Sequence, residues 1–160
     1  MQRLINIYHS ITYHEKIMIL ISFMGIIPFM IGLLDLWFNQ DNFIFPINFV
    51  KYYGVIILTF LGSMYWGIIL NQNKTITFSN QFKILIIIWS ITPALGGTLI
   101  LLIDKDISLI ILSIGYLICQ IMDEIYNKFL FFPNWYILLR RLLSFTVITI
   151  LVSCYLILKY

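Results

Sequence analysis

Apolar residues dominate five stretches of this chain, and short segments that hold most of the charged residues separate them. The stretches cover residues 17–38, 52–70, 84–103, 107–122 and 142–158. Most of them approach the roughly 20 residues that a helix needs to cross a hydrocarbon layer about 30 Å thick. The pattern therefore predicts an all-α membrane protein with about five transmembrane helices in a single bundle, and four helices are the alternative.

The last two stretches, 107–122 and 142–158, are short for a membrane span. Either the bilayer thins around them, or the charged residues that flank them extend outward to the headgroups. Pro133 and Asn134 suit the start of the last helix, which we expect to follow the membrane interface before it turns inward near Arg140.

Residues 1–16 precede the first apolar stretch and form a separate N-terminal segment, whereas 17–160 form the transmembrane domain. Leu4, Ile7, Tyr8 and Ile11 recur at helical spacing in this segment. A short helix lying on the membrane surface has this pattern. A frayed terminus is the alternative.

Composition excludes a water-soluble domain. Hydrophobic residues make up 61% of the chain and charged residues 11%, and the mean hydropathy is +0.97. A soluble domain usually carries about 25% charged residues. The net charge of +3 is dispersed along the chain, so we expect the lipid bilayer and other membrane subunits as partners, and no nucleic acid.

The distribution of Lys and Arg predicts the orientation. With five spans, seven of the ten basic residues lie on the same side as the N-terminus. Short cytoplasmic loops carry an excess of Lys and Arg. We therefore expect the N-terminus on the cytoplasmic or matrix side of a bacterial or mitochondrial inner membrane.

The sequence contains few groups that could carry catalysis or bind a cofactor. Its two histidines, His9 and His14, both precede the first apolar stretch, so they cannot grip a haem or a metal inside the bilayer. We expect no catalytic residue, no metal and no cofactor, and an enzyme acting on lipid would need a nucleophile that we cannot locate.

Charged residues are expected near the ends of the spans. Asp35, the one acidic residue inside an apolar stretch, lies close to its outer end, and Lys51 is the natural partner there. On the inner side, Asp123 and Glu124 face the same layer as Arg140 and Arg141. We expect one group of ion-paired side chains at each membrane interface.

Small residues recur in the second and third stretches. They are Gly54, Thr59, Gly62, Ser63 and Gly67 in the second stretch, and Ser90, Ala94 and Gly97 in the third. Helices in lipid associate by close backbone approach over such residues. These two helices should form the packing centre, although the pattern alone cannot separate an internal interface from one that binds a partner.

Pro28 and Pro93 lie near the middle of the first and third stretches, and each is followed by glycine four residues later. Corresponding breaks in two helices can mark the substrate site of a transporter. Proline also kinks helices only for packing, and neither break carries a charge at mid-depth.

The segment Tyr53–Gly62, followed by Trp66 and Gly67, resembles the signature of a bacterial and mitochondrial membrane family. Further segments occur in the family's order: Ile27-Pro28-Phe29, Pro93, Asp123, Pro133, Trp135-Tyr136 and Leu139-Arg140. The family is catalogued as domain of unknown function 3429, and its animal members are called transmembrane protein 69. The resemblance covers about residues 17–158, and it implies a small five-helix inner-membrane protein to which no catalytic residue can be assigned.

Together these features favour a non-enzymatic accessory or assembly subunit that packs against other membrane subunits of a respiratory-type complex. The alternative is a small transporter or channel that uses the helix breaks at Pro28 and Pro93.

Overall fold

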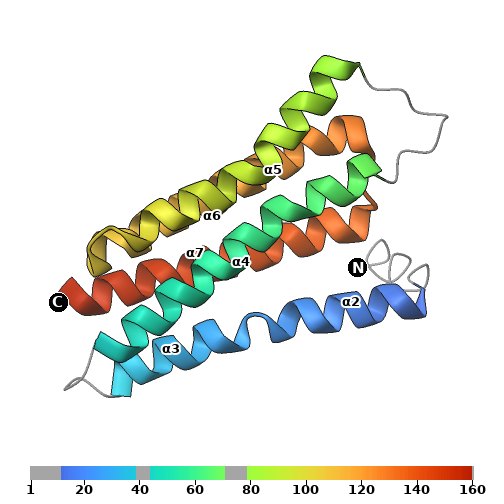
Figure 1. Cartoon of the computed structure of the whole chain (residues 1–160). Helices are drawn as coiled ribbons and strands as arrows, with labels where there is room; N and C mark the ends of the chain where they lie inside the picture. The colour runs from blue at the N-terminus through green and yellow to red at the C-terminus, as the bar shows by residue number, and fades with distance from the viewer. Residues whose placement is uncertain (1–11, 39–43, 71–78, 160) are drawn as a thin grey trace.

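The structure is a computed structural model that describes residues 12–38, 44–70 and 79–159, and every regular element in these ranges is an α-helix. In chain order they are α2 (Tyr13–Met24), α3 (Ile27–Phe38), α4 (Ile44–Leu70), α5 (Asn80–Leu101), α6 (Lys105–Leu130) and α7 (Asn134–Lys159). With α2 and α3 taken as one span, five spans are long and apolar enough to cross a membrane (Figure 1). The prediction of an all-α, five-span protein is confirmed.

The lengths predicted for the last two spans were wrong. Helices α6 and α7 have 26 residues each, and α7 begins at Asn134, as predicted, but runs without interruption and therefore does not turn near Arg140. The apolar pattern ended at charged residues, but these residues pair with one another and both helices continue past them. The first span begins at Tyr13 rather than residue 17, and the rest of the predicted interfacial segment, residues 1–11, lies outside the described residues.

The first span is broken between α2 and α3. The amide of Ile26 donates to the carbonyl of Phe23, three residues back, and Pro28 has no amide hydrogen to continue the helical pattern. The hydroxyl of Tyr53 on α4 donates to the carbonyl of Gly25 at 3.0 Å. The side chain of a neighbouring helix thus satisfies a backbone oxygen at the break, which apolar lipid could not do.

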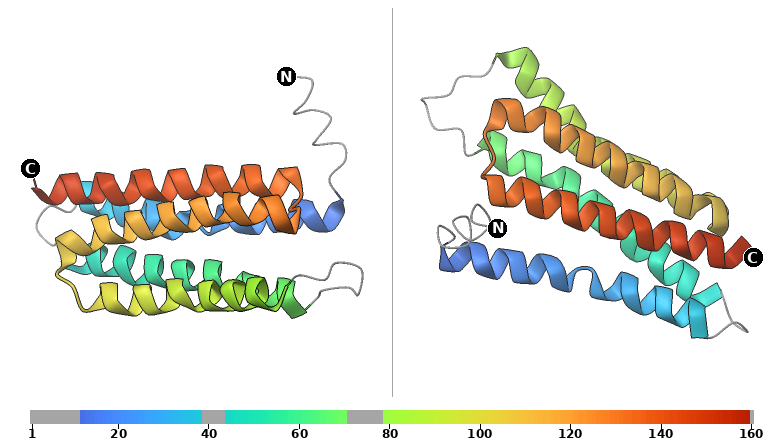
Figure 2. Two further views of the ribbon diagram at one scale, coloured as in Figure 1. Left: turned by 90° about the horizontal axis from the view of Figure 1, so that it is seen from above. Right: turned by 180° about the vertical axis from the view of Figure 1, so that it is seen from behind.

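The helices form a bundle with two extensive pairs, α4 with α5 and α6 with α7. The left view of Figure 2 shows α4 and α5 on one side of the bundle, with α6 and α7 on the other. Helix α3 contacts α4 and α7, whereas α2 contains no buried residue and lies at the margin. The start of α2 and the end of α7 are at opposite ends of the bundle (Figure 1).

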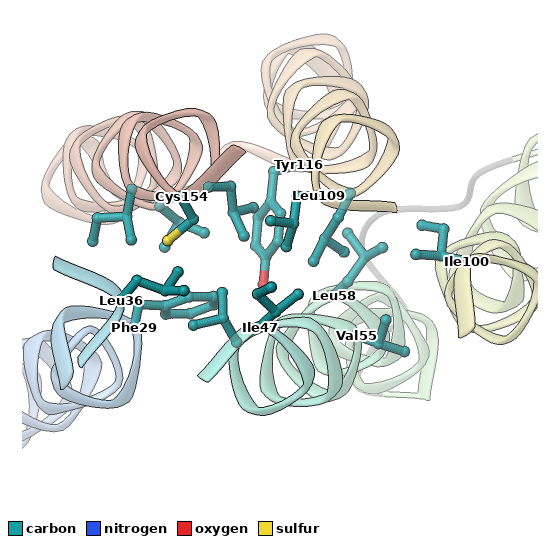
Figure 3. Packing of buried hydrophobic residues seen from close by; sticks show 14 of the residues in the cluster. Phe29, Leu36, Ile47, Val55, Leu58, Ile100, Leu109, Tyr116 and Cys154 are labelled. Carbon is teal, nitrogen blue, oxygen red and sulfur yellow. The ribbon is translucent and has the colours of Figure 1, made fainter. Parts of the chain in front are cut away.

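The main core gathers apolar side chains between these helices (Figure 3). Phe29, Val55, Leu58 and Leu112 are among its buried members. Tyr116 points from α6 toward α4, where its hydroxyl donates to the carbonyl of Gly54 at 2.8 Å. A second cluster forms around Tyr65 on α4, Ile86 on α5 and Tyr126 on α6.

Helices α6 and α7 are joined by three residues, Phe131–Pro133. Phe131 adopts the left-handed conformation, with φ 53°, and caps α6. The amide of Phe132 donates to Oδ1 of Asn127 at 3.0 Å. Because the connection is so short, the two helices lie antiparallel, and residues at similar distances from Phe132 along the chain lie at similar heights on the two helices.

Candidate functional site

A carboxylate and a guanidinium meet between α6 and α7. Nε of Arg140 donates to Oδ2 of Asp123 at 2.8 Å, and Nη2 of Arg140 lies 2.6 Å from the same oxygen. Asp123 is 1% exposed and Arg140 is 6% exposed. The register set by the short connection explains this pairing, because the two residues lie nine before and eight after Phe132.

Tyr65 links this ion pair to α4. Its hydroxyl donates to Oδ1 of Asp123 at 2.5 Å, and its side chain is fully buried. The rings of Tyr126 and Phe132 pack against the Tyr65 ring, with centroids 5.2 Å and 6.5 Å away. Both oxygens of the carboxylate therefore accept hydrogen bonds, as a buried charge requires.

The pair lies inward from the ends of both helices, and its predicted position at the membrane interface stays a prediction. Asp123 is between five and six residues from the middle of α6, and Arg140 between six and seven from the middle of α7. At 1.5 Å per residue these distances are about 8 Å and 10 Å. Both residues thus fall within the half-thickness of about 15 Å of a hydrocarbon layer centred on the helices.

A second ion pair lies beside the first, on the outside of the bundle. Arg141 donates from Nε to Oε1 of Glu124 at 2.5 Å and from Nη2 to Oε2 at 2.7 Å. The side chains of this pair are much more exposed than those of Asp123 and Arg140. The structure therefore brings together all four residues of the predicted inner cluster as two parallel pairs, one buried and one peripheral.

At the other end of the bundle, Lys51 is buried on α4. Its Nζ donates to the carbonyls of Leu101 at 3.2 Å and Ile103 at 2.7 Å, so it caps the turn between α5 and α6. Asp35 is half-buried on α3. The proposed pairing of Asp35 with Lys51 stays a prediction.

Three of the predicted packing glycines lie where neighbouring helices approach closely. A Cβ added to Gly62 would come within 2.6 Å of the carbonyl oxygen of Ser90, and one added to Gly97 within 2.9 Å of Val55 Cγ1. One added to Gly54 would come within 2.5 Å of Leu112 Cδ2. The first two contacts hold α4 against α5, and the third holds α4 against α6.

The remaining predicted packing residues divide between the inside and the outside of the bundle. Ser90 is buried, and Thr59 and Ala94 are half-buried. Ser63 and Gly67 are exposed on α4, and a Cβ added to Gly67 would meet nothing within 4 Å. The periodic pattern of small residues on α4 therefore covers two faces, of which only one is used inside the bundle.

The two prolines occupy different kinds of position. Pro28 is the second residue of α3, directly after the break in the first span. Pro93 lies inside α5, which continues without interruption, and its ring faces the α carbon of Gly62. Only Pro28 accompanies a visible break in a helix.

Three residues that share the polar region with the ion pair were missed by sequence reasoning: Tyr65, Gln120 and Ser144. The apolar residues Ile125, Tyr126, Phe129 and Leu130 follow Asp123 at helical spacing. They were the signal that α6 extends past Asp123, and a longer α6 places that carboxylate inside the span.

Within the described ranges, no group of three or more His, Cys, Asp and Glu side chains is arranged to hold a metal ion. Both cysteines are free and buried. The expectation that the protein has no cofactor and no catalytic residue stays a prediction.

A family model described as "Protein of unknown function (DUF3429)" matches residues 14–156. No curated protein and no solved structure is significantly similar to the chain. The family match covers nearly the whole chain and includes every residue of the two ion pairs.

Proposed function

The chain belongs to the DUF3429 family, and we propose that this multi-pass membrane protein is a non-enzymatic accessory or assembly subunit that packs against other membrane subunits. A bacterial or mitochondrial inner membrane, with a complex of the respiratory type, is the setting that we propose. The excess of Lys and Arg on one side favours an N-terminal end that faces the cytoplasm or the matrix.

The observation that carries this proposal is the outward position of Ser63 and Gly67. These small residues are four apart on α4, and both are exposed. The hydroxyl of Ser63 donates to the carbonyl of Phe60 in its own helix, so it does not prevent an apolar helix from approaching. Small residues at this spacing let a second transmembrane helix come close enough for extensive van der Waals contact.

The buried ion pair suits a scaffold. Both oxygens of Asp123 accept hydrogen bonds from within the bundle, from Tyr65 and Arg140, and these bonds fix α4, α6 and α7 relative to one another. A rigid bundle keeps the α4 surface in one shape. A partner helix then meets a preorganised surface, which reduces the ordering that binding requires.

The test is native mass in a gentle detergent. We expect the full-length protein to migrate with a larger complex and the double variant Ser63→Leu/Gly67→Leu to migrate alone. Thr149→Leu on α7 is the matched control, because Thr149 is also exposed and also donates to a carbonyl of its own helix. Equal recovery of the complex with the double variant and the control would contradict the proposal.

A small transporter or channel is the second candidate, and one observation favours it. Asp123 and Arg140 are ionisable residues within a span, a position that often marks the path of an ion or a substrate. This candidate predicts substrate flux in liposomes that is lost in Asp123→Asn and on changing Pro28 or Pro93. A protein that migrates alone and carries such a flux would favour transport over the accessory role.

A further inference from the structure

Two buried polar atoms of the described residues have no hydrogen-bond partner: Oε1 of Gln120 on α6 and Oγ of Ser144 on α7. Gln120 is 6% exposed and Ser144 is 3% exposed. An unsatisfied polar group in a membrane interior is expensive, because lipid offers no donor or acceptor in place of water.

The register between α6 and α7 places these two buried residues at the same height on the two helices. Gln120 and Ser144 each lie twelve residues from Phe132, in opposite directions along the chain. Asp123 and Arg140 follow the same register and are in direct contact. Gln120 and Ser144 therefore occupy the next helical turn beyond the ion pair, toward the middle of the bilayer.

The amide of Gln120 has a defined orientation. Its Nε2 donates to Oε1 of Glu124 at 3.1 Å. Reversing the amide would bring its oxygen against the carboxylate, which also accepts hydrogen bonds only. The carbonyl oxygen of the Gln120 side chain thus points away from Glu124 and needs a donor from elsewhere.

The hydroxyl of Ser144 also departs from its neighbours. Most serine and threonine hydroxyls in the spans donate to a carbonyl three or four residues back, as in Ser113 to Leu109 and Thr146 to Leu142. Ser144 lacks this bond although it lies within the same kind of helix. Its hydroxyl is therefore available to a partner outside its own backbone.

We propose that a buried site between α6 and α7 binds water, which donates to Oε1 of Gln120 and accepts from the hydroxyl of Ser144. One water molecule satisfies both atoms, and buried waters in proteins typically make about three hydrogen bonds to such groups. The site extends the polar region of Asp123, Arg140 and Tyr65 by one helical turn into the bilayer. This inference does not depend on the proposed function.

Radiolytic footprinting in lipid nanodiscs tests the site, because X-ray pulses convert bound water into hydroxyl radicals that oxidise adjacent side chains. Cys119 directly precedes Gln120 and lies at about the height of Ser144, whereas Cys154 lies near the other end of α7. The two thiols are 5% and 0% exposed, so each is closed to bulk solvent. We expect Cys119 to be oxidised several times faster than Cys154, measured by mass spectrometry.

Equal rates for the two thiols in the native protein would overturn the proposal. That result would fit a Ser144 hydroxyl turned to the carbonyl of Arg140, with no water present. In the double variant Gln120→Leu/Ser144→Ala, which removes both polar atoms, we expect the rate at Cys119 to fall to that of Cys154. An unchanged rate at Cys119 in a folded double variant would also reject the site. The comparison within the native protein remains decisive if that variant does not fold.

Discussion

The two most extensive helix pairs of the bundle are held together by opposite kinds of contact. Between α4 and α5, Gly62 and Gly97 allow the backbones to approach, and the contacting atoms include Pro93 and the Ser90 carbonyl. Between α6 and α7, a salt bridge joins Asp123 to Arg140 at 2.6 Å. The closest contacts of the first pair involve glycines, a proline and a backbone carbonyl, whereas the second pair is built around charged side chains.

The difference follows from what lipid can and cannot supply. Apolar side chains gain little by leaving lipid for a protein interior, so helix association in a membrane depends on close packing and on polar bonds. The α4–α5 pair depends on close packing and needs a precise shape. The α6–α7 pair depends on polar bonds and needs both charged partners, because either charge alone in a low-dielectric interior is strongly unfavourable.

Removing one partner of the buried ion pair should have the largest effect on stability. Arg140→Met leaves the Asp123 carboxylate without its counter-charge, and breaking such a pair costs about 3–5 kcal/mol. In Asp123→Asn/Arg140→Met neither charge remains and Asn can still accept from Tyr65, so most of the loss should be recovered. Denaturant titration in mixed micelles measures the free energy of unfolding of the single and the double variant.

The peripheral ion pair supplies the control for that experiment. Arg141→Met removes an equivalent contact, to Glu124, from a side chain that is exposed. The loss of unfolding free energy in Arg141→Met should be much smaller than in Arg140→Met, because the Glu124 carboxylate that remains can reach the interface. If both single variants lose the same free energy, burial does not distinguish the two pairs and the comparison fails.

The glycine contact should give the next largest effect. Gly62→Leu forces a side chain against the carbonyl oxygen of Ser90, and overpacking of this kind typically costs about 1–3 kcal/mol. Gly67 is on the same helix with nothing near its α carbon, so Gly67→Leu should leave the free energy of unfolding almost unchanged. The same titration measures both variants, and an equal loss in the two would show that α4 and α5 do not pack through Gly62.

How far the sequence predicts the structure differs between these two regions. The small residues of α4 and α5 identified a close contact with the backbone of α5, because spacing alone places Gly62 and Ser90 on helix faces. The spacing could not show that Ser63 and Gly67 point outward, because residues that repeat every four positions shift gradually around a helix of 3.6 residues per turn.

The ion pair shows a different limit. All four charged residues of the two ion pairs were found, but the sequence did not show which pair is buried in the bundle, because hydropathy treats each charge as if it stood alone. Asp123 and Arg140 neutralise one another only when α6 and α7 are antiparallel and in register. That register depends on Phe131, which caps α6 in the left-handed conformation. Glycine usually occupies such a position, so the sequence carries no clear signal for this cap.

The smallest predicted effect on the free energy of unfolding is the difference between two tyrosines that each donate one hydrogen bond to another helix, but to different kinds of acceptor. Tyr65 donates to the Asp123 carboxylate, and Tyr116 donates to the carbonyl of Gly54. Hydrogen bonds between membrane helices contribute about 0.6 kcal/mol on average and up to about 1.7 kcal/mol. Bonds to charged groups are the stronger ones, so Tyr65→Phe should approach the upper value.

Tyr116→Phe should lie near the average, because the Gly54 carbonyl is within α4 and keeps its place in the helical hydrogen-bond pattern. Both tyrosines are almost fully buried, so the two substitutions remove the same atom from similar packing. The difference between their free energies of unfolding therefore reflects whether the acceptor is a carboxylate or a backbone carbonyl, and not a difference in burial. Equal values would mean that the charge of the acceptor does not set the strength of these two hydrogen bonds.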